Sequence, residues 1–142
     1  MKNNPRIAII GAGLGGTAGA GLMAKAGFNV KVYEQAPAFA RMGAGIHLGP
    51  NVMKVMRKLG IEDELNRTGA HPDYWYSRDG ITGDVMAQIP LGDYAESHYG
   101  ASYLTVHRGD FHKLMTDALP EGVLEFNKKL ETIEDLGDKV VM

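Results

Sequence analysis

Ile7-Ala-Ile-Ile10, followed at once by Gly11-Ala-Gly13-Leu-Gly15-Gly16, carries the strongest structural signal in this 142-residue chain. A short β-branched run that ends in glycine is typical of a buried parallel strand. Apolar residues then recur at helical spacing, at Leu14, Ala18, Leu22 and Ala26. Because Gly27 suits a helix C-terminus and residues 28–33 are again β-branched, the stretch predicts a strand, a helix and a second parallel strand.

The spacing Gly11-x-Gly13-x-x-Gly16 between this strand and this helix is typical of dinucleotide-binding turns. Glycine allows the tight turn and leaves room for a pyrophosphate to approach backbone N–H groups at the helix N-terminus. Glu34 ends the second strand, near the spacing of about 20 residues expected for a ribose-binding carboxylate. An acidic residue there favours FAD or NAD over NADP. The alternative is that the glycines only let the helix pack closely on the sheet.

Composition excludes several classes of function. Fifteen Lys and Arg against seventeen Asp and Glu give a net charge of −2 without blocks of like charge, which argues against nucleic-acid and anionic-membrane partners. The absence of cysteine excludes disulfides and thiolate metal sites, and His107 and His112 are not spaced as a helical metal pair. No metal site is predicted. Without a long apolar run or a signal-peptide pattern, we expect a soluble cytoplasmic protein.

The remaining segments predict a mixed α/β chain. Residues 41–50 are too rich in glycine for an ordinary helix or central strand and are interpreted as a functional loop. Asn51 is expected to cap a helix that Gly60 stops. The other expected elements are a helix over 62–67, a hairpin over 74–90 with a turn at Asp79-Gly80, strands over 103–106 and 123–126, a helix over 109–119, and a hairpin formed by 130–134 and 139–142.

Several motifs along the chain resemble one enzyme family. They are Gly11-Ala-Gly-Leu-Gly-Gly16, Val32-Tyr-Glu-Gln-Ala36, Arg41-Met-Gly-Ala-Gly-Ile-His47, Pro50-Asn-Val-Met53 and Val106-His-Arg-Gly-Asp-Phe-His-Lys-Leu114. Together they resemble the single-component FAD-dependent aromatic hydroxylases, the class of salicylate and p-hydroxybenzoate hydroxylases. Members of that family are more than twice as long, and their Asp-Gly and Gly-Asp flavin motifs would fall beyond position 142. The chain therefore resembles the N-terminal part of such an enzyme.

The resemblance implies an α/β fold: a Rossmann-like FAD-binding unit with a mostly parallel sheet and an adjoining antiparallel hairpin region, incomplete in this chain. Residues 1–72 would form the first part of the FAD-binding domain. Residues 73–102 would begin a substrate-side sheet. Residues 103–142 would return to the FAD-binding domain.

The resemblance also implies which residues bind the cofactor. Gly11, Gly13, Gly15 and Gly16 would cradle the pyrophosphate, Glu34 would hold the adenosine ribose with Gln35 beside it, and Leu130 would lie beside the adenine. Arg108 would reach the flavin from the start of a helix, where its planar guanidinium suits a pyrophosphate. Arg41 would lie near the flavin. The alternatives are a surface ion pair for Arg108, a solvated side chain for Arg41 and plain core packing for Leu130.

His47 is the catalytic candidate. Aromatic hydroxylation requires an electron-rich ring, so the enzyme has to remove or orient the proton of the substrate hydroxyl, and histidine suits that task near neutral pH. The alternative is a histidine that only makes hydrogen bonds within the glycine-rich segment.

The activity implied by the resemblance is decarboxylative hydroxylation of 6-hydroxynicotinate to 2,5-dihydroxypyridine. FAD would be the cofactor, NADH the co-substrate, and a small aromatic acid and molecular oxygen the partners. The open alternatives are a salicylate or 3-hydroxybenzoate hydroxylase of the same family, and a non-catalytic FAD-binding fragment. The sequence carries no signal for an oligomeric state.

Overall fold

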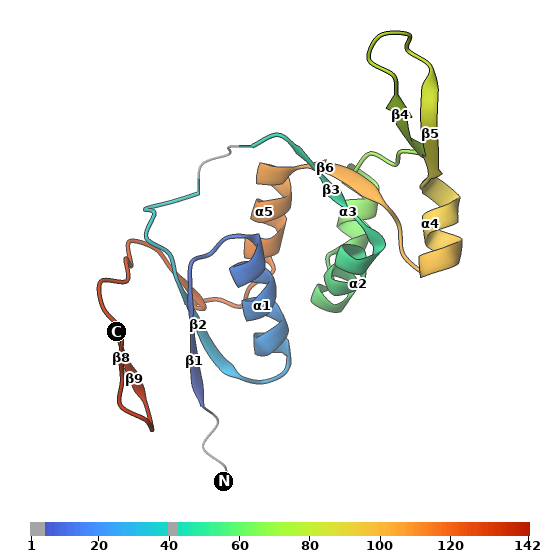
Figure 1. Cartoon of the computed structure of the whole chain (residues 1–142). Helices are drawn as coiled ribbons and strands as arrows, with labels where there is room; N and C mark the ends of the chain where they lie inside the picture. The colour runs from blue at the N-terminus through green and yellow to red at the C-terminus, as the bar shows by residue number, and fades with distance from the viewer. Residues whose placement is uncertain (1–4, 40–42) are drawn as a thin grey trace. The chain divides into compact units, whose positions relative to one another are not determined.

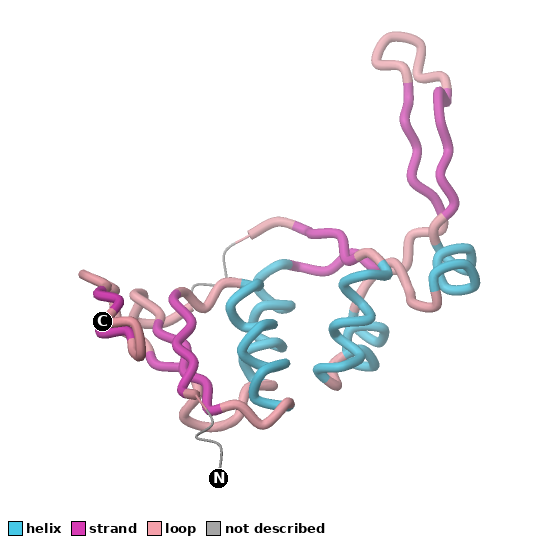
Figure 2. Tube along the Cα trace, turned by 60° about the horizontal axis from the view of Figure 1, so that its bottom comes forward, coloured by secondary structure: helices cyan, strands magenta, loops and turns pink. Residues whose placement is uncertain are grey.

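The computed structural model describes residues 5–39 and 43–142 as a mixture of helices and strands (Figures 1 and 2). Its elements are, in order, β1 (Arg6–Ile10), α1 (Leu14–Lys25), β2 (Asn29–Tyr33), β3 (Gly45–Leu48), α2 (Pro50–Leu59), α3 (Glu62–Thr68), β4 (Tyr74–Arg78), β5 (Val85–Pro90), α4 (Gly92–Tyr99), β6 (Leu104–His107), α5 (Arg108–Asp117), β7 (Leu124–Glu125), β8 (Glu134–Asp135) and β9 (Val140–Val141). This order confirms the predicted α/β class.

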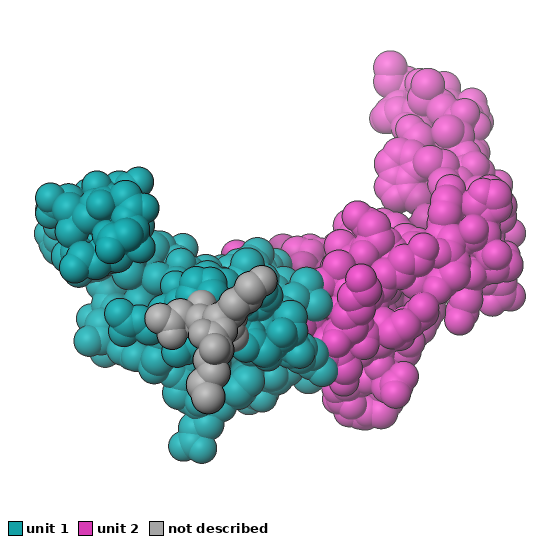
Figure 3. Space-filling model, turned by 90° about the horizontal axis from the view of Figure 1, so that it is seen from below, with its two compact units in different colours: residues 1–41, 112–142 teal, residues 42–111 magenta. Residues whose placement is uncertain are grey.

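The chain divides into two compact units (Figure 3). Unit 1 comprises residues 1–41 and 112–142, and unit 2 comprises residues 42–111. No helix in the described parts of the chain has the length and apolar character needed to cross a membrane.

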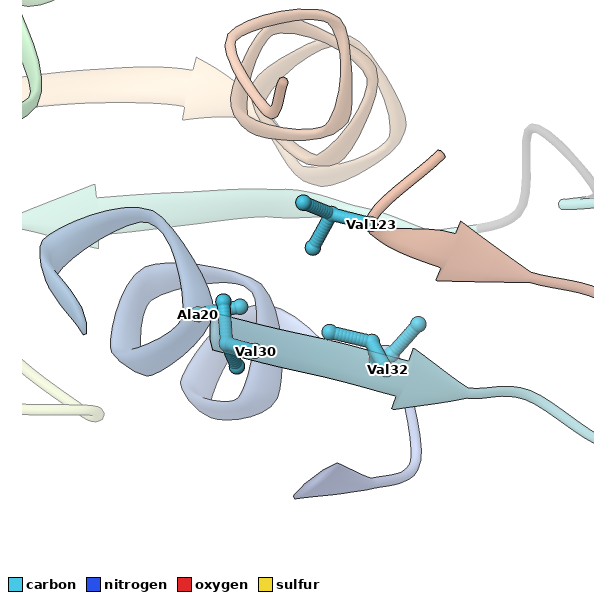
Figure 4. Packing of buried hydrophobic residues seen from close by; sticks show 5 residues of the cluster. Ala20, Val30, Val32 and Val123 are labelled. Atoms are coloured by element: carbon cyan, nitrogen blue, oxygen red, sulfur yellow. The ribbon is translucent and has the colours of Figure 1, made fainter. Parts of the chain in front are cut away.

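Unit 1 is built on a parallel sheet with the strand order β1-β2-β7. The predicted strand–helix–strand unit is confirmed, because β1 pairs in parallel with β2 from Arg6 opposite Asn29 to Ile10 opposite Tyr33. The much later strand β7 then joins the free side of β2. Figure 4 shows part of the core, in which Ala20 of α1 meets valines of the sheet. The buried members of this core are Ala12, Ala20, Val30, Val32 and Val123.

The turn between β1 and α1 depends on glycine at two positions. Gly11 has φ +90°, a left-handed conformation that residues with a Cβ rarely adopt. A Cβ at Gly16 would collide with the carbonyl oxygen of Gly11, so only glycine lets the first turn of α1 pack this closely on the end of β1. The packing role that the sequence left open as an alternative is therefore present at Gly16.

Unit 2 contains the helices α2, α3 and α4 and a two-stranded antiparallel sheet of β3 and β6. The prediction of a loop over residues 41–50 is wrong for residues 45–48, which form β3. Their pairing with β6 supplies backbone hydrogen bonds, and Leu48 is buried. These tertiary contacts override the low strand propensity of the flanking glycines.

The start of α2 also differs from its prediction. Gly49 is the N-cap residue and Pro50 occupies the first turn, so the predicted cap at Asn51 is wrong. Proline is favoured there because its fixed φ suits a helix start and its missing N–H would have no partner within the helix. Gly60 ends α2 in the left-handed conformation, as expected.

The hairpin of β4 and β5 is confirmed, and in Figure 1 it extends away from the helices of unit 2. Asp79 organises its connection, because its Oδ1 accepts hydrogen bonds from the N–H groups of Ile81 and Thr82. Large apolar side chains along both strands remain about half exposed or more, among them Trp75 at 48% and Met86 at 70%. The following helix α4 is not predicted by the sequence pattern.

The C-terminal hairpin of unit 1 is shorter than predicted. Strands β8 and β9 pair over two residues each, and Leu130 precedes β8 in irregular backbone. The predicted first arm, 130–134, is thus mostly loop.

Candidate dinucleotide site

Glu34 follows β2 and binds the glycine-rich turn. Its Oε2 accepts a hydrogen bond from the N–H of Ala12 at 2.9 Å, and its Oε1 accepts one from the N–H of Ala36 at the same distance. The N–H groups of Ala36 and then Ala12 hold the pKa of the Glu34 carboxyl below its ordinary value, because they stabilise the charged form. The carboxylate that the sequence assigned to a ribose therefore also organises the turn.

The N-terminus of α1 is open to an anion. Gly13 is the N-cap residue with extended backbone, and the first turn of α1 holds no acidic residue. The first N–H groups of a helix have no acceptor within it and carry partial positive charge. A Cβ at Gly13 or Gly15 would meet no atom within 4 Å, so both glycines face open space. The turn thus offers backbone donors that a phosphate oxygen can approach.

His112 lies on α5 and touches the same turn. Its Nε2 is 2.6 Å from the carbonyl oxygen of Ala12. The imidazole packs edge-on against Phe39, with ring centroids 4.2 Å apart, and Phe39 packs in turn against Phe126. The turn is therefore bound from two sides, at the N–H of Ala12 by Glu34 and at its carbonyl by His112.

A pocket of approximately 430 Å³ opens in unit 1 where β1 and β2 end. That volume is within the range of about 300–1,000 Å³ typical of small-molecule sites. Leu130 is one of the residues that line it. The lining residues are Ile10, Tyr33, Lys128, Lys129, Leu130, Glu131, Thr132 and Met142. The lining combines apolar side chains with charged and polar ones, and such a mixture suits a flat ring that carries hydrogen-bonding edges.

His47 and Arg108 belong to unit 2. His47 is exposed on β3 opposite Thr105, and its ring centroid is 5.8 Å from that of Tyr103. Arg108 is the exposed first residue of α5, and its backbone N–H donates to the carbonyl of Ala44 at 3.1 Å. A Cβ at Gly43, which has φ +137°, would come within 3.0 Å of the Arg108 Cβ. Glycine at position 43 therefore leaves room for the arginine side chain.

The structure brings some of the predicted site residues together. The glycine turn, Glu34 and Gln35 are neighbours in unit 1, and the backbone N–H of Gln35 also helps to lower the pKa of Glu34, after the larger effects of Ala36 and Ala12. Arg41 lies outside the described residues. Among the residues that are described, no three His, Asp or Glu side chains gather in a metal-binding cluster.

His112 contacts the turn although no sequence pattern predicts this contact. The spacing Arg108-Gly-Asp-Phe-His112 puts two chemically versatile side chains one helical turn apart. That signal marks a shared helix face and does not say what the face contacts. The hydrogen bond to Ala12 spans 100 residues of sequence and depends on the tertiary fold.

Comparison with known sequences identifies similar proteins. The chain is 73% identical over 140 residues to a 6-hydroxynicotinate 3-monooxygenase of Bordetella bronchiseptica and 66% identical over 142 residues to one of Pseudomonas fluorescens. These alignments cover 99% and 100% of this chain and 37% of each relative. The chain thus spans a little over a third of the length of these relatives.

Comparison with solved structures agrees with the fold. The crystal structure of Klebsiella pneumoniae HpxO complexed with FAD and uric acid has a TM-score of 0.81 and 27% identity to this chain, over 99% of this chain and 35% of that one. The p-nitrophenol 4-monooxygenase PnpA of Pseudomonas putida has a TM-score of 0.81 at 20% identity, over 95% of this chain and 35% of that one, and shows the fold alone. The sequence also matches the model of the family described as FAD binding domain over residues 5–140. Since that match spans nearly the whole chain, the protein belongs to the FAD-binding domain family.

Proposed function

We propose that the glycine turn, Glu34 and the pocket lined by Leu130 hold the ADP half of FAD. Three features of unit 1 support this. Gly13 and Gly15 face open space at the helix N-terminus, Glu34 stands beside the same turn, and a pocket of about 430 Å³ lies at the ends of β1 and β2. The Glu34 carboxylate has further lone pairs that can accept from ribose hydroxyls, and its negative charge disfavours a 2′-phosphate.

Two glycine-to-alanine variants test this cofactor site. Gly13→Ala adds a methyl group that meets no protein atom within 4 Å but would obstruct the proposed approach of the pyrophosphate. Gly19→Ala adds one that also meets nothing, in the middle of α1. We expect Gly13→Ala to weaken FAD binding by at least about tenfold, a loss of about 1.4 kcal/mol, while Gly19→Ala binds FAD like the wild type. Equal FAD affinity in both variants, measured by flavin fluorescence, would contradict the assignment.

For the whole protein we propose hydroxylation of 6-hydroxynicotinate with loss of its carboxyl group. The observation that carries this proposal is the 73% and 66% identity to two 6-hydroxynicotinate 3-monooxygenases. A 3-hydroxybenzoate 6-hydroxylase of Aquipseudomonas alcaligenes is only 36% identical over 143 residues. In the balanced reaction, NADH supplies two electrons, one atom of O₂ enters the ring and the other leaves as water, and the products are 2,5-dihydroxypyridine and CO₂. FAD supplies the oxygen chemistry when bound.

In this proposal, His47 of unit 2 acts on the substrate, and Arg108 of unit 2 acts on the cofactor. His47 would take or orient the proton of the substrate hydroxyl, which its exposure on β3 permits. Arg108 would bind the pyrophosphate or flavin through its exposed guanidinium, and Arg41 would lie nearby. We further propose that the protein acts in the cytoplasm, on a small aromatic acid, and binds neither nucleic acid nor membrane.

A chimera tests the substrate assignment. The matching 37% of the Bordetella relative would be replaced by this chain, so that the remainder of that protein completes the enzyme. We expect the chimera to oxidise NADH and form 2,5-dihydroxypyridine from 6-hydroxynicotinate, within about tenfold of the rate of the relative. Preference for salicylate or 3-hydroxybenzoate would favour the alternative hydroxylases. A chimera that binds FAD but hydroxylates none of these acids would favour a non-catalytic FAD-binding chain.

A further inference from the structure

In the hydrogen bond between His112 and the glycine turn, His112 is the donor. A carbonyl oxygen only accepts hydrogen bonds, so the 2.6 Å contact to Ala12 requires the His112 Nε2 to carry a proton. The His112 ring packs edge-on against Phe39, with ring centroids 4.2 Å apart. The donor therefore comes from a side chain that is itself held in place.

The carbonyl of Ala12 belongs to the same peptide unit as the N–H of Gly13. In a trans peptide the C=O and N–H bonds point in opposite directions across one rigid plane. Fixing the carbonyl on His112 thus directs the Gly13 N–H away from α5, toward the open side of the turn. A hydrogen bond to the carbonyl also polarises the peptide and strengthens its N–H as a donor.

Glu34 fixes the preceding peptide unit. The N–H that it accepts from belongs to the Gly11–Ala12 peptide, whereas His112 binds the Ala12–Gly13 peptide. Two consecutive peptide planes of the turn are held by side chains from two distant parts of the chain, Glu34 after β2 and His112 on α5. A turn rich in glycine has more conformational freedom to lose than any other, so external hydrogen bonds of this kind reduce the cost of ordering it.

We propose that His112 is a positioning residue of the dinucleotide site, which holds the Ala12–Gly13 peptide so that the Gly13 N–H faces the pyrophosphate. The proposal rests on the proposed function for the identity of the ligand. The ordering of the turn by His112 does not depend on that identity.

Two substitutions separate the effect of the His112 N–H donor from the effect of its ring packing. His112→Phe keeps an aromatic ring against Phe39 and removes the N–H, whereas His112→Gln keeps a donor and removes the ring. His71→Phe is the matched control, because its Nε2 contacts the carbonyl of Asn66 at 2.8 Å in unit 2, far along the chain from the glycine turn. The readouts are amide hydrogen exchange of residues 11–17 in the free chain and FAD affinity by flavin fluorescence.

We expect His112→Phe to accelerate exchange in residues 11–17 and to weaken FAD binding by about tenfold, and His112→Gln to stay within about twofold to threefold of wild type in both. Exchange of this segment in His112→Phe at the wild-type rate would overturn the proposal. So would a His112→Gln variant that exchanges as fast as His112→Phe, since ring packing would then be the cause. If His112→Phe does not fold, the test rests on His112→Gln. Exchange of residues 11–17 at the wild-type rate in His112→Gln would then support the proposal, and faster exchange would overturn it.

Failure of the proposed function has a different signature. If the wild-type chain and the chimera both fail to bind FAD, the cofactor assignment is wrong, while hydrogen exchange in the free chain still reports whether His112 orders the turn.

Discussion

Glu34 uses one carboxylate to join the end of β2 to the turn before α1, and this gives the chain a pH-dependent element of stability. Its pKa in the folded chain lies below the ordinary value of 4.5, because the N–H groups of Ala36 and Ala12 stabilise the anion. A carboxyl with a depressed folded-state pKa stabilises the fold above its unfolded-state pKa and loses that contribution as pH falls through the folded-state value.

We therefore expect wild type to be more stable than Glu34→Gln at pH 7, and the difference to shrink as pH falls below about 4.5. Urea unfolding of both proteins between pH 7 and pH 3 measures the difference. Glu121→Gln, at an exposed position, is the control and should unfold like wild type at neutral pH. A Glu34→Gln deficit that stays constant down to pH 3 would show that the charge has no part in the effect.

His47 is predicted to take or orient the proton of the substrate hydroxyl. In the chimera, His47→Ala should lower the hydroxylation rate by about ten- to a thousandfold while FAD content stays near that of the parent, because the side chain would act on the substrate proton and not on the cofactor. Single-turnover rates and the flavin absorbance of the purified protein measure the two effects. Unchanged turnover would remove His47 from the mechanism.

At the scale of elements, α1 packs against the turn at Gly16 so closely that no side chain fits. Gly16→Ala should lower the free energy of unfolding by about 1–3 kcal/mol, since the new methyl group would collide with the Gly11 carbonyl. Gly15→Ala is one residue away in the same helix and meets no atom, so it should be neutral or stabilising by up to about 1 kcal/mol. Denaturant unfolding of both variants tests the pair, and equal stabilities would contradict the packing described for Gly16.

The sequence predicted the elements whose defining residues lie close together along the chain. The β1-α1-β2 unit has a β-branched run, a glycine turn and a capping glycine in order, and the 74–90 hairpin has two strand-like runs about one turn. The glycine content of residues 41–50 predicts a loop, whereas residues 45–48 form β3 through their pairing with β6. Helix α4 lacked a signal, because its short sequence buries little more than Ala95.

In the candidate site, too, contacts between residues close in sequence could be predicted and contacts between distant residues could not. The glycine spacing and Glu34 are close in sequence, so their proximity could be predicted. His112 contacts a residue 100 positions away, and no local pattern encodes that pairing. Whether His47, Arg108 and Leu130 act as the resemblance implies stays a prediction.

At the scale of the whole molecule, the β4–β5 hairpin has two strands and apolar side chains that remain exposed along both of them. If residues 73–102 begin a substrate-side sheet, as the sequence predicts, a longer enzyme should cover this hairpin. We expect hydrogen exchange over residues 74–90 to be fast in the 142-residue chain and slower by on the order of tenfold or more in the chimera, because covered strand amides are protected. Residues 29–33, whose strand β2 is paired on both sides within unit 1, should exchange alike in the two proteins. Equal exchange rates of residues 74–90 in the chain and the chimera would contradict the predicted domain division. If residues 29–33 also exchanged more slowly in the chimera, the cause would be a global difference in stability between the two proteins.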